Sequence, residues 1–134
     1  MACCDTLHAR GPRLVVITSL HYAGADLSGR TRQDIHILGS RRRPGQAPER
    51  YLLTVPRRPG YYSGLGDLLA ALLLAWTARL GEGELREALY RSVCSVQAVI
   101  AATEAAGCKE IRLVQAKAAL EDPPRLDFIR VTPL

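Results

Sequence analysis

The residues best suited to chemistry in this chain are two glycines and an aspartate that precede its most apolar segment, in the stretch YYSGLGDLLAALLLAW at 61–76. The start of a helix carries free N–H groups and a positive dipole end, and glycines let a phosphate reach these groups without obstruction. A carboxylate placed there can accept the proton of a hydroxyl group that attacks the phosphate. Gly64, Leu65, Gly66 and Asp67 are therefore candidates for an anion site with a catalytic base.

A structural interpretation of the same residues is simpler. Aspartate is a preferred helix N-cap, and glycine is frequent beside such a cap. The motif GxGD is weak on its own. From spacing alone, helix capping by Asp67 is favoured over catalysis.

A second candidate is the hydroxyl pair Thr18 and Ser19, which ends the β-branched run LVVITS at 14–19. In open α/β sheets, ligands bind at the carboxyl ends of the strands, so these side chains would face a ligand. Serine and threonine after a strand are also common in ordinary turns. Both interpretations of the pair stay open.

The arginines form a third candidate group. The formal net charge of the chain is +5, and the basic surplus is concentrated at Arg41, Arg42, Arg43, Arg57 and Arg58. Such a loop suits a phosphate-bearing ligand or an acidic partner, and it could fold over nucleotide phosphates, but a solvated hairpin tip is the simpler interpretation. No aromatic residues are interleaved to stack bases, so nucleic acid is not the expected partner.

The cysteines and histidines show no metal-ligand spacing, and no metal-binding residues are predicted. With no CxxC pair, we expect free thiols in a reducing, cytoplasmic compartment. The cysteines and histidines are Cys3, Cys4, Cys94, Cys108, His8, His21 and His36.

The longest apolar run, at 68–78, is too short to span a bilayer, and no signal peptide is recognised, so no membrane association is expected.

The order of elements favours an α/β fold with a mostly parallel sheet. The run 14–19 suits a strand buried on both faces, and a hairpin with a basic tip is predicted from the strand-like segments 33–40 and 50–55. A helix at 67–79, apolar on every side, should be buried all round. The remaining elements expected are a helix at 2–10, a loop at 21–30, a helix at 84–106, a strand at 111–114, a helical turn at 116–120 and a last strand at 126–131.

Several motifs, taken in order, resemble one family of small-molecule kinases. These are LHARGPRLVVITS, LGSRRR, ERYLLTV, YYSGLGDLLAALLLAWT and IRLVQAKAALEDP. Together they are similar to the C-terminal half of the pyridoxal kinases, which are members of the ribokinase-like superfamily. The resemblance implies a three-layer fold with a β-hairpin and flanking helices, of which residues 1–134 would be a single partial domain without the N-terminal half.

The resemblance also implies roles for residues. Gly64, Gly66 and Asp67 match the family's GTGD motif, which forms the anion hole and supplies the base, while Thr18 and Ser19 match a nucleotide-contacting pair. The family's flexible segment over the nucleotide would fall near 53–62. Leu65 stands where the family has threonine, so a hydroxyl group is lost from the phosphate side.

The function implied is ATP-dependent phosphorylation of the 5′-hydroxyl of pyridoxal, pyridoxine or pyridoxamine. Mg²⁺ and a monovalent cation are the implied cofactors, and a homodimer is implied for the full-length family. The pyridoxal pocket, the lid and the acidic residues around Mg²⁺ belong to the N-terminal half, which has no counterpart here. The alternative is therefore a non-catalytic fragment that binds nucleotide or associates with another kinase chain.

Overall fold

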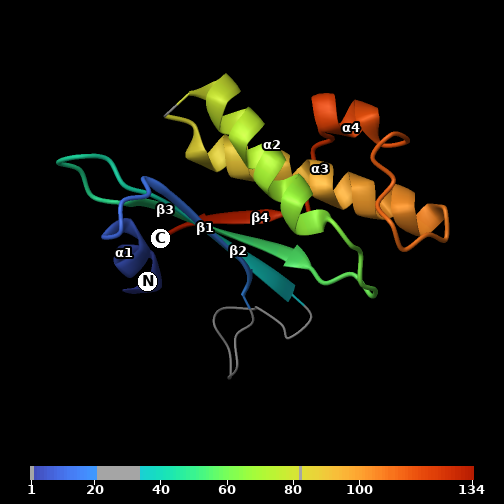
Figure 1. Cartoon of the computed structure of the whole chain (residues 1–134), viewed down its shortest axis with the longest axis horizontal. Coiled ribbons are helices and arrows are strands. Elements are labelled where there is room, and N and C mark those ends of the chain that lie inside the picture. The colour runs from blue at the N-terminus through green and yellow to red at the C-terminus, as the bar shows by residue number, and fades with distance from the viewer. Residues whose placement is uncertain (1, 21–33, 82) are drawn as a thin grey trace. The chain divides into compact units, whose positions relative to one another are not determined.

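The computed structural model describes residues 2–20, 34–81 and 83–134, which form two compact units (Figure 1). One unit comprises Met1–Arg57 and Phe128–Leu134, and the other comprises Arg58–Asp127. The loop predicted at 21–30 lies outside the described residues. The elements are α1 (Ala2–His8), β1 (Leu14–Leu20), β2 (Asp34–Arg41), β3 (Glu49–Pro56), α2 (Leu65–Leu80), α3 (Leu85–Ala105), α4 (Lys117–Glu121) and β4 (Arg130–Pro133).

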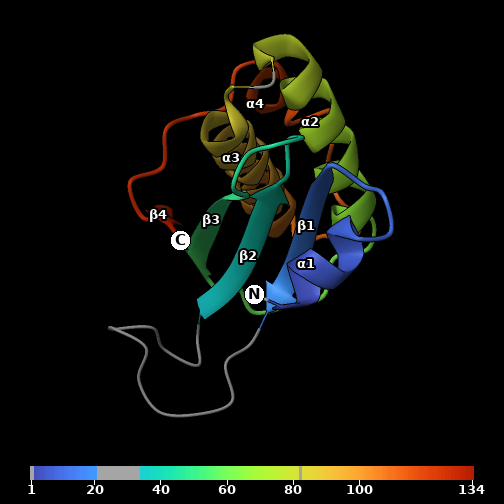
Figure 2. The same cartoon turned by 90° about the vertical axis from the view of Figure 1, so that its left-hand side faces the viewer.

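The first unit contains a four-stranded sheet in the order β1-β2-β3-β4, in which β1, β2 and β3 lie side by side (Figure 2). Each neighbouring pair is antiparallel, so the expected mostly parallel sheet is wrong for the described strands. The physical reason is the connectivity. Parallel neighbours need a crossover connection of a dozen or more residues, whereas β2 and β3 are joined by a short turn that only antiparallel neighbours allow.

The predicted β-hairpin is confirmed. Strands β2 and β3 pair without interruption from Asp34 opposite Pro56 to Arg41 opposite Glu49. Pro44 and Gly45 lie in the turn between the strands, as the Pro/Gly signal indicated. The basic tip of this hairpin is therefore a real feature of the fold.

Strand β1 was expected to be buried on both faces, and this is wrong. It is an edge strand of the described sheet, and only Val15 among its residues is buried. Val15 packs with Cys4 of α1 and with Leu38 and Leu52 of the neighbouring strands. A β-branched run identifies a strand but does not distinguish an edge position from a central one.

The second unit is built on the helices α2 and α3, which pack through Leu72, Trp76 and Ala88. The helix at 84–106 is confirmed as α3, but α2 is not buried all round, because the side chain of Leu74 is 74% exposed. Alanines cover much of the same face of α2, and their small side chains are equally compatible with burial and exposure. The apolar composition therefore did not reveal which face is covered.

The segment after α3 returns along that helix without forming the predicted strand at 111–114. The backbone N–H of Arg112 donates to Thr103 Oγ1 at 3.0 Å, so a side chain of α3 takes the place of a strand partner. Among the described residues, the strand-like contact of this segment is an isolated parallel bridge between Ser63 and Glu110. The helical turn expected at 116–120 is present as α4, and the last strand occurs slightly later than predicted, as β4.

No helix among the described residues is both long and apolar enough to cross a lipid bilayer.

Candidate functional site

Helix α2 begins at Leu65, and Gly64 is its N-cap. The first helical bond runs from the N–H of Leu68 to the carbonyl oxygen of Gly64 at 3.0 Å. The three N–H groups of Leu65, Gly66 and Asp67 therefore lie outside the ladder of helical bonds, at the positive end of the dipole. Asp67 is the third residue of the helix and not its cap, so the capping interpretation of this aspartate is wrong.

The presence of glycine has a different physical explanation at each of the two glycine positions of the motif. Gly64 adopts the left-handed conformation, with φ 89°, and an added Cβ would lie 3.2 Å from Ile111 Cδ1. The fold itself therefore requires glycine at this position. At Gly66 an added Cβ would meet nothing within 4 Å, although glycine is disfavoured inside a helix. Packing gives no reason for glycine there, while open access of an anion to the backbone does.

The Asp67 side chain is exposed at this helix start. It makes no hydrogen bond or ion pair with another residue that the structure describes. Its carboxylate is therefore available to accept a hydrogen bond or a proton from a bound hydroxyl group.

The loop before α2 is held to α3 by Glu104, which the sequence did not identify. Glu104 Oε2 pairs with the Arg58 guanidinium at 3.0 Å, and Glu104 Oε1 accepts from the Tyr62 hydroxyl at 3.1 Å. Desolvation raises the pKa of the Tyr62 phenol, and the neighbouring Glu104 carboxylate raises that pKa further. The phenol therefore stays protonated as a hydrogen-bond donor, and these contacts fix the approach to Gly64.

The segment expected to be flexible, 53–62, is only partly a loop. Residues Leu53 to Val55 are buried within β3, which continues to Pro56. The loop proper is the stretch 57–63 between β3 and α2. The family resemblance placed its boundary too early because strand residues adjoin this loop directly.

Thr18 and Ser19 lie near the carboxyl end of β1, where the pairing with β2 is irregular between Ile17 and Leu20. Both side chains are exposed. Ser19 has a positive φ of 56°, a conformation that costs free energy for a non-glycine residue and is often found at functional sites. The pair belongs to the first unit and Asp67 to the second, so a shared site for the two groups stays a prediction.

The arginine-rich tip of the hairpin lies at the other end of β1 from this pair. In the sheet register Arg41 is opposite Leu14, four residues before Thr18. At about 3.3 Å per residue, this separates the two positions by roughly 13 Å. The hairpin tip and the hydroxyl pair therefore lie at opposite ends of β1, and the solvated tip stays the simpler interpretation of the arginines.

The described residues contain no group of three histidines, cysteines or carboxylates that could hold a metal ion. All four cysteines are free thiols, and burial raises the pKa of the Cys4 and Cys94 thiols. At the start of α2, Asp67 is a single carboxylate, which does not by itself make a magnesium site. The described part of the chain therefore does not fit a resident Mg²⁺ ion.

The chain was compared with known proteins in sequence and in structure. No family model matches it. A pyridoxal kinase of Arabidopsis thaliana is 31% identical in an alignment of 131 residues that covers 90% of this chain and 39% of that protein. The pyridoxal kinase of Homo sapiens is 34% identical, in an alignment that covers 89% of this chain and 42% of the human protein.

Among solved structures, the chain resembles pyridoxal kinase from Leishmania donovani in complex with ADP and pyridoxine. The TM-score is 0.75 at 27% identity, over 98% of this chain and 42% of that one. The chain thus spans about two fifths of the length of the relatives it matches. This partial coverage agrees with the resemblance to their C-terminal half. In sequence and in fold, the chain is a relative of the pyridoxal kinases of the ribokinase-like superfamily and corresponds to about two fifths of their length.

Proposed function

We propose that this chain supplies the nucleotide-binding and base-bearing part of an ATP-dependent pyridoxal kinase. The reaction is transfer of the γ-phosphate of ATP to the 5′-hydroxyl of pyridoxal, pyridoxine or pyridoxamine. The observation that carries this proposal is the start of α2, where free N–H groups, an unobstructed Gly66 and an unpaired Asp67 carboxylate occur within one helical turn. In this proposal the two units are parts of a single partial domain.

The residues act in distinct ways. Asp67 accepts the proton as the 5′-hydroxyl oxygen forms its bond to the γ-phosphorus, and the bond to the β-phosphate oxygen breaks to release ADP. The N–H groups of Leu65, Gly66 and Asp67 donate to the phosphoryl oxygens while negative charge moves across them. Thr18 and Ser19 hold the nucleotide through their exposed hydroxyls. Leu65 contributes only its N–H, where the family threonine would add a hydroxyl group.

Cations have a limited place in the proposal. Mg²⁺, and a monovalent cation as in the family, would neutralise phosphate charge when bound. The described residues contain no cluster of His, Cys, Asp or Glu side chains that could hold a metal ion, so we assign no step of the reaction to a cation. We place the protein in the cytoplasm because its cysteines are free, and we expect a homodimer from the family resemblance.

The second candidate function is that of a non-catalytic fragment that binds nucleotide or associates with another kinase chain. It is favoured by the coverage, since the chain matches only about two fifths of each relative. The exposed apolar face of α2 at Leu74 also suits association with further polypeptide.

The test is an assay for pyridoxal 5′-phosphate formation from pyridoxal, ATP and Mg²⁺, with the wild-type chain and Asp67→Asn side by side. The variant keeps the size of the side chain and removes the base. Turnover that falls about 100-fold or more in the variant supports the kinase with Asp67 as base. A folded wild-type chain without turnover, but with ADP binding, supports the non-catalytic fragment. Equal turnover of both proteins would show that the base assignment is wrong.

A further inference from the structure

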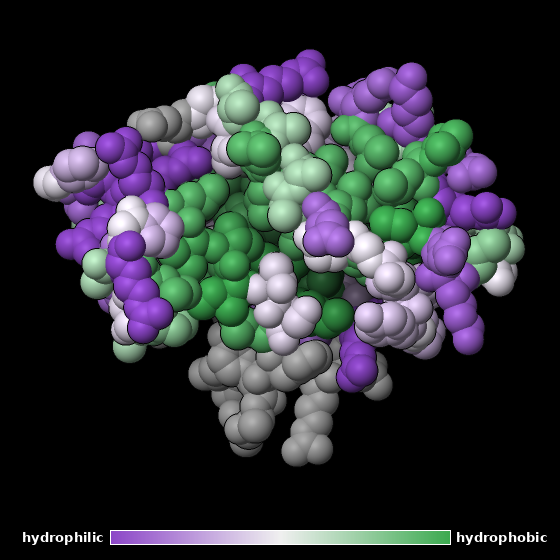
Figure 3. Space-filling view, viewed as in Figure 1, coloured by the Kyte–Doolittle hydropathy of each residue, from purple (hydrophilic) through white to green (hydrophobic). Residues whose placement is uncertain are grey.

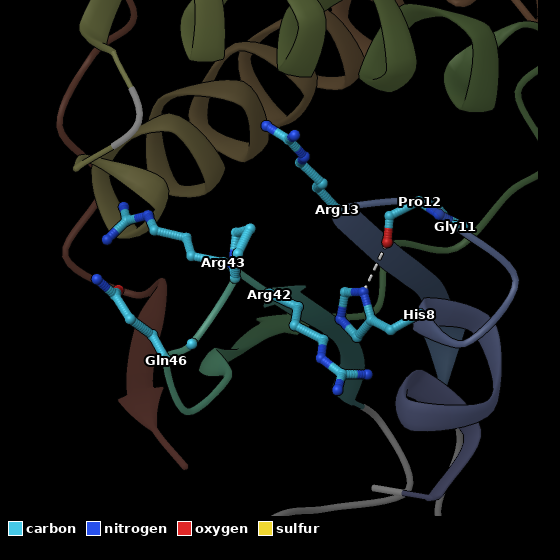
Figure 4. Close-up of a pocket in the computed structure, with 9 residues that line it drawn as sticks. His8, Gly11, Pro12, Arg13, Arg42, Arg43 and Gln46 are labelled. Atoms are coloured by element: carbon cyan, nitrogen blue, oxygen red, sulfur yellow. Dashed lines mark hydrogen bonds between the residues drawn. The ribbon is translucent and has the colours of Figure 1, made fainter.

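A second candidate binding site lies in the first unit, away from Thr18 and Ser19. A pocket of about 430 Å³ opens between the turn after α1 and the tip of the β2–β3 hairpin (Figure 4). This volume lies within the range of small-molecule sites. Its lining residues are His8, Gly11, Pro12, Arg13, Arg42, Arg43, Pro44, Gly45 and Gln46.

The pocket carries positive charge that is only partly neutralised. Arg43 pairs with Glu49 at 3.7 Å. Arg13 and Arg42 are exposed, and neither pairs with an acidic group of the described residues. The three guanidinium groups extend in different directions around the pocket (Figure 4). Like charges without a counter-ion repel one another, and a bound anion would supply the counter-charge.

The backbone around the pocket is fixed from within the unit. The buried His8 ring lies with Nδ1 at 2.8 Å from the Pro12 carbonyl oxygen and Nε2 at 2.9 Å from Ser40 Oγ. The N–H of Arg42 donates to the carbonyl oxygen of Arg13 at 2.8 Å, which joins the turn to the hairpin. The frame is therefore preformed, while the long arginine side chains can still move toward a ligand.

We propose that this pocket binds a small anion that carries two or more phosphate groups. Guanidinium groups match phosphate oxygens in bidentate geometry, and several cations spread around one opening suit several linked phosphates better than a single one. No Phe, Tyr or Trp side chain lines the pocket to stack a base, and the His8 ring is buried and hydrogen-bonded within the unit, which disfavours a nucleic acid strand. The site is independent of the proposed kinase function, since it lies at the opposite end of β1 from Thr18 and Ser19.

The test is calorimetric titration of the full chain with inorganic tripolyphosphate at moderate salt. The variants are Arg13→Gln and Arg42→Gln, singly and together. Arg57→Gln is the matched control, because it removes the same charge from an exposed residue at the other end of the hairpin from the pocket. Arg57 directly follows Pro56, and Pro56 is opposite Asp34 at that end. We expect saturable binding to the wild type, a loss of about tenfold in affinity for each single variant, and wild-type affinity for Arg57→Gln.

Three results would overturn the proposal. These are no saturable binding to the folded wild type, equal weakening in Arg57→Gln, and full affinity in the double variant, which would place the anion at another site such as the start of α2. The same titration with a single-stranded oligonucleotide tests the alternative ligand. Tighter binding of the oligonucleotide than of tripolyphosphate, lost in the double variant, would show that the pocket binds nucleic acid and not a small anion. The assay is separable from the kinase test, because Arg42 lies outside the proposed kinase site and Arg42→Gln should leave the formation of pyridoxal 5′-phosphate unchanged.

Discussion

Replacing Gly66 by alanine should separate the stability of helix α2 from ligand binding at its start. The position is helical, and a Cβ would enter empty space. Alanine is favoured over glycine by up to about 1 kcal/mol in a helix interior, so we expect the free energy of unfolding to rise by roughly 0.5 kcal/mol in this first turn. The new methyl group would stand beside the free N–H groups, where a phosphate must approach.

The expected cost to binding follows from the lost contact. One charge-assisted hydrogen bond from an N–H group to a phosphate contributes about 1.5–3 kcal/mol, so nucleotide affinity should fall roughly tenfold or more. Gly64→Ala is the contrasting variant. The left-handed conformation costs a non-glycine residue about 1–2 kcal/mol, and Ile111 Cδ1 at 3.2 Å must also move, so this variant should be less stable.

The two properties are measured by urea unfolding followed by circular dichroism, and by calorimetric titration with ADP. A Gly66→Ala protein that is at least as stable as the wild type and binds ADP more weakly supports the site. Unchanged ADP affinity in this variant would show that Gly66 has no role in ligand access. Higher stability of Gly64→Ala would contradict the structural reason given for that glycine.

Two further predictions concern the packed interior. Trp76→Ala, in the contact between α2 and α3, should lower the free energy of unfolding by about 3–5 kcal/mol, while Leu74→Ala, at an exposed position of α2, should change it by less than about 0.5 kcal/mol in urea unfolding. The pKa of the Cys4 and Cys94 thiols is raised in the folded chain, so folding favours their protonated form. The free energy of unfolding should therefore be constant below the usual thiol pKa and fall as the pH rises above it. A free energy of unfolding that rises through that pH range would contradict the burial of these thiols.

Local signals in the sequence predicted the elements that depend on neighbouring residues. The hairpin followed from two strand-like runs around Pro44 and Gly45, and α3 followed from apolar residues at helical spacing closed by Gly107. These signals act within a few residues and need no knowledge of the rest of the chain. The motif at Gly64–Asp67 was located for the same reason.

The local patterns did not predict which segments distant in the sequence pair with one another. The run at 14–19 identified β1 but not its antiparallel partner or its edge position, which depend on β2. The strand predicted at 111–114 failed because Thr103, on another element, binds the backbone of Arg112. At the site, the role of Glu104 could not be found from the sequence, since it acts on Arg58 and Tyr62 more than forty residues earlier.

The most direct test of the central claim is a comparison of turnover and ADP binding in the wild-type chain and in Asp67→Asn. We expect both proteins to bind ADP alike, because the N–H groups of the first turn of α2 are retained. We expect the formation of pyridoxal 5′-phosphate to fall about 100-fold or more in the variant, because the base is lost. Equal turnover in the two proteins, or a folded wild-type chain that binds no ADP, would contradict the proposed function.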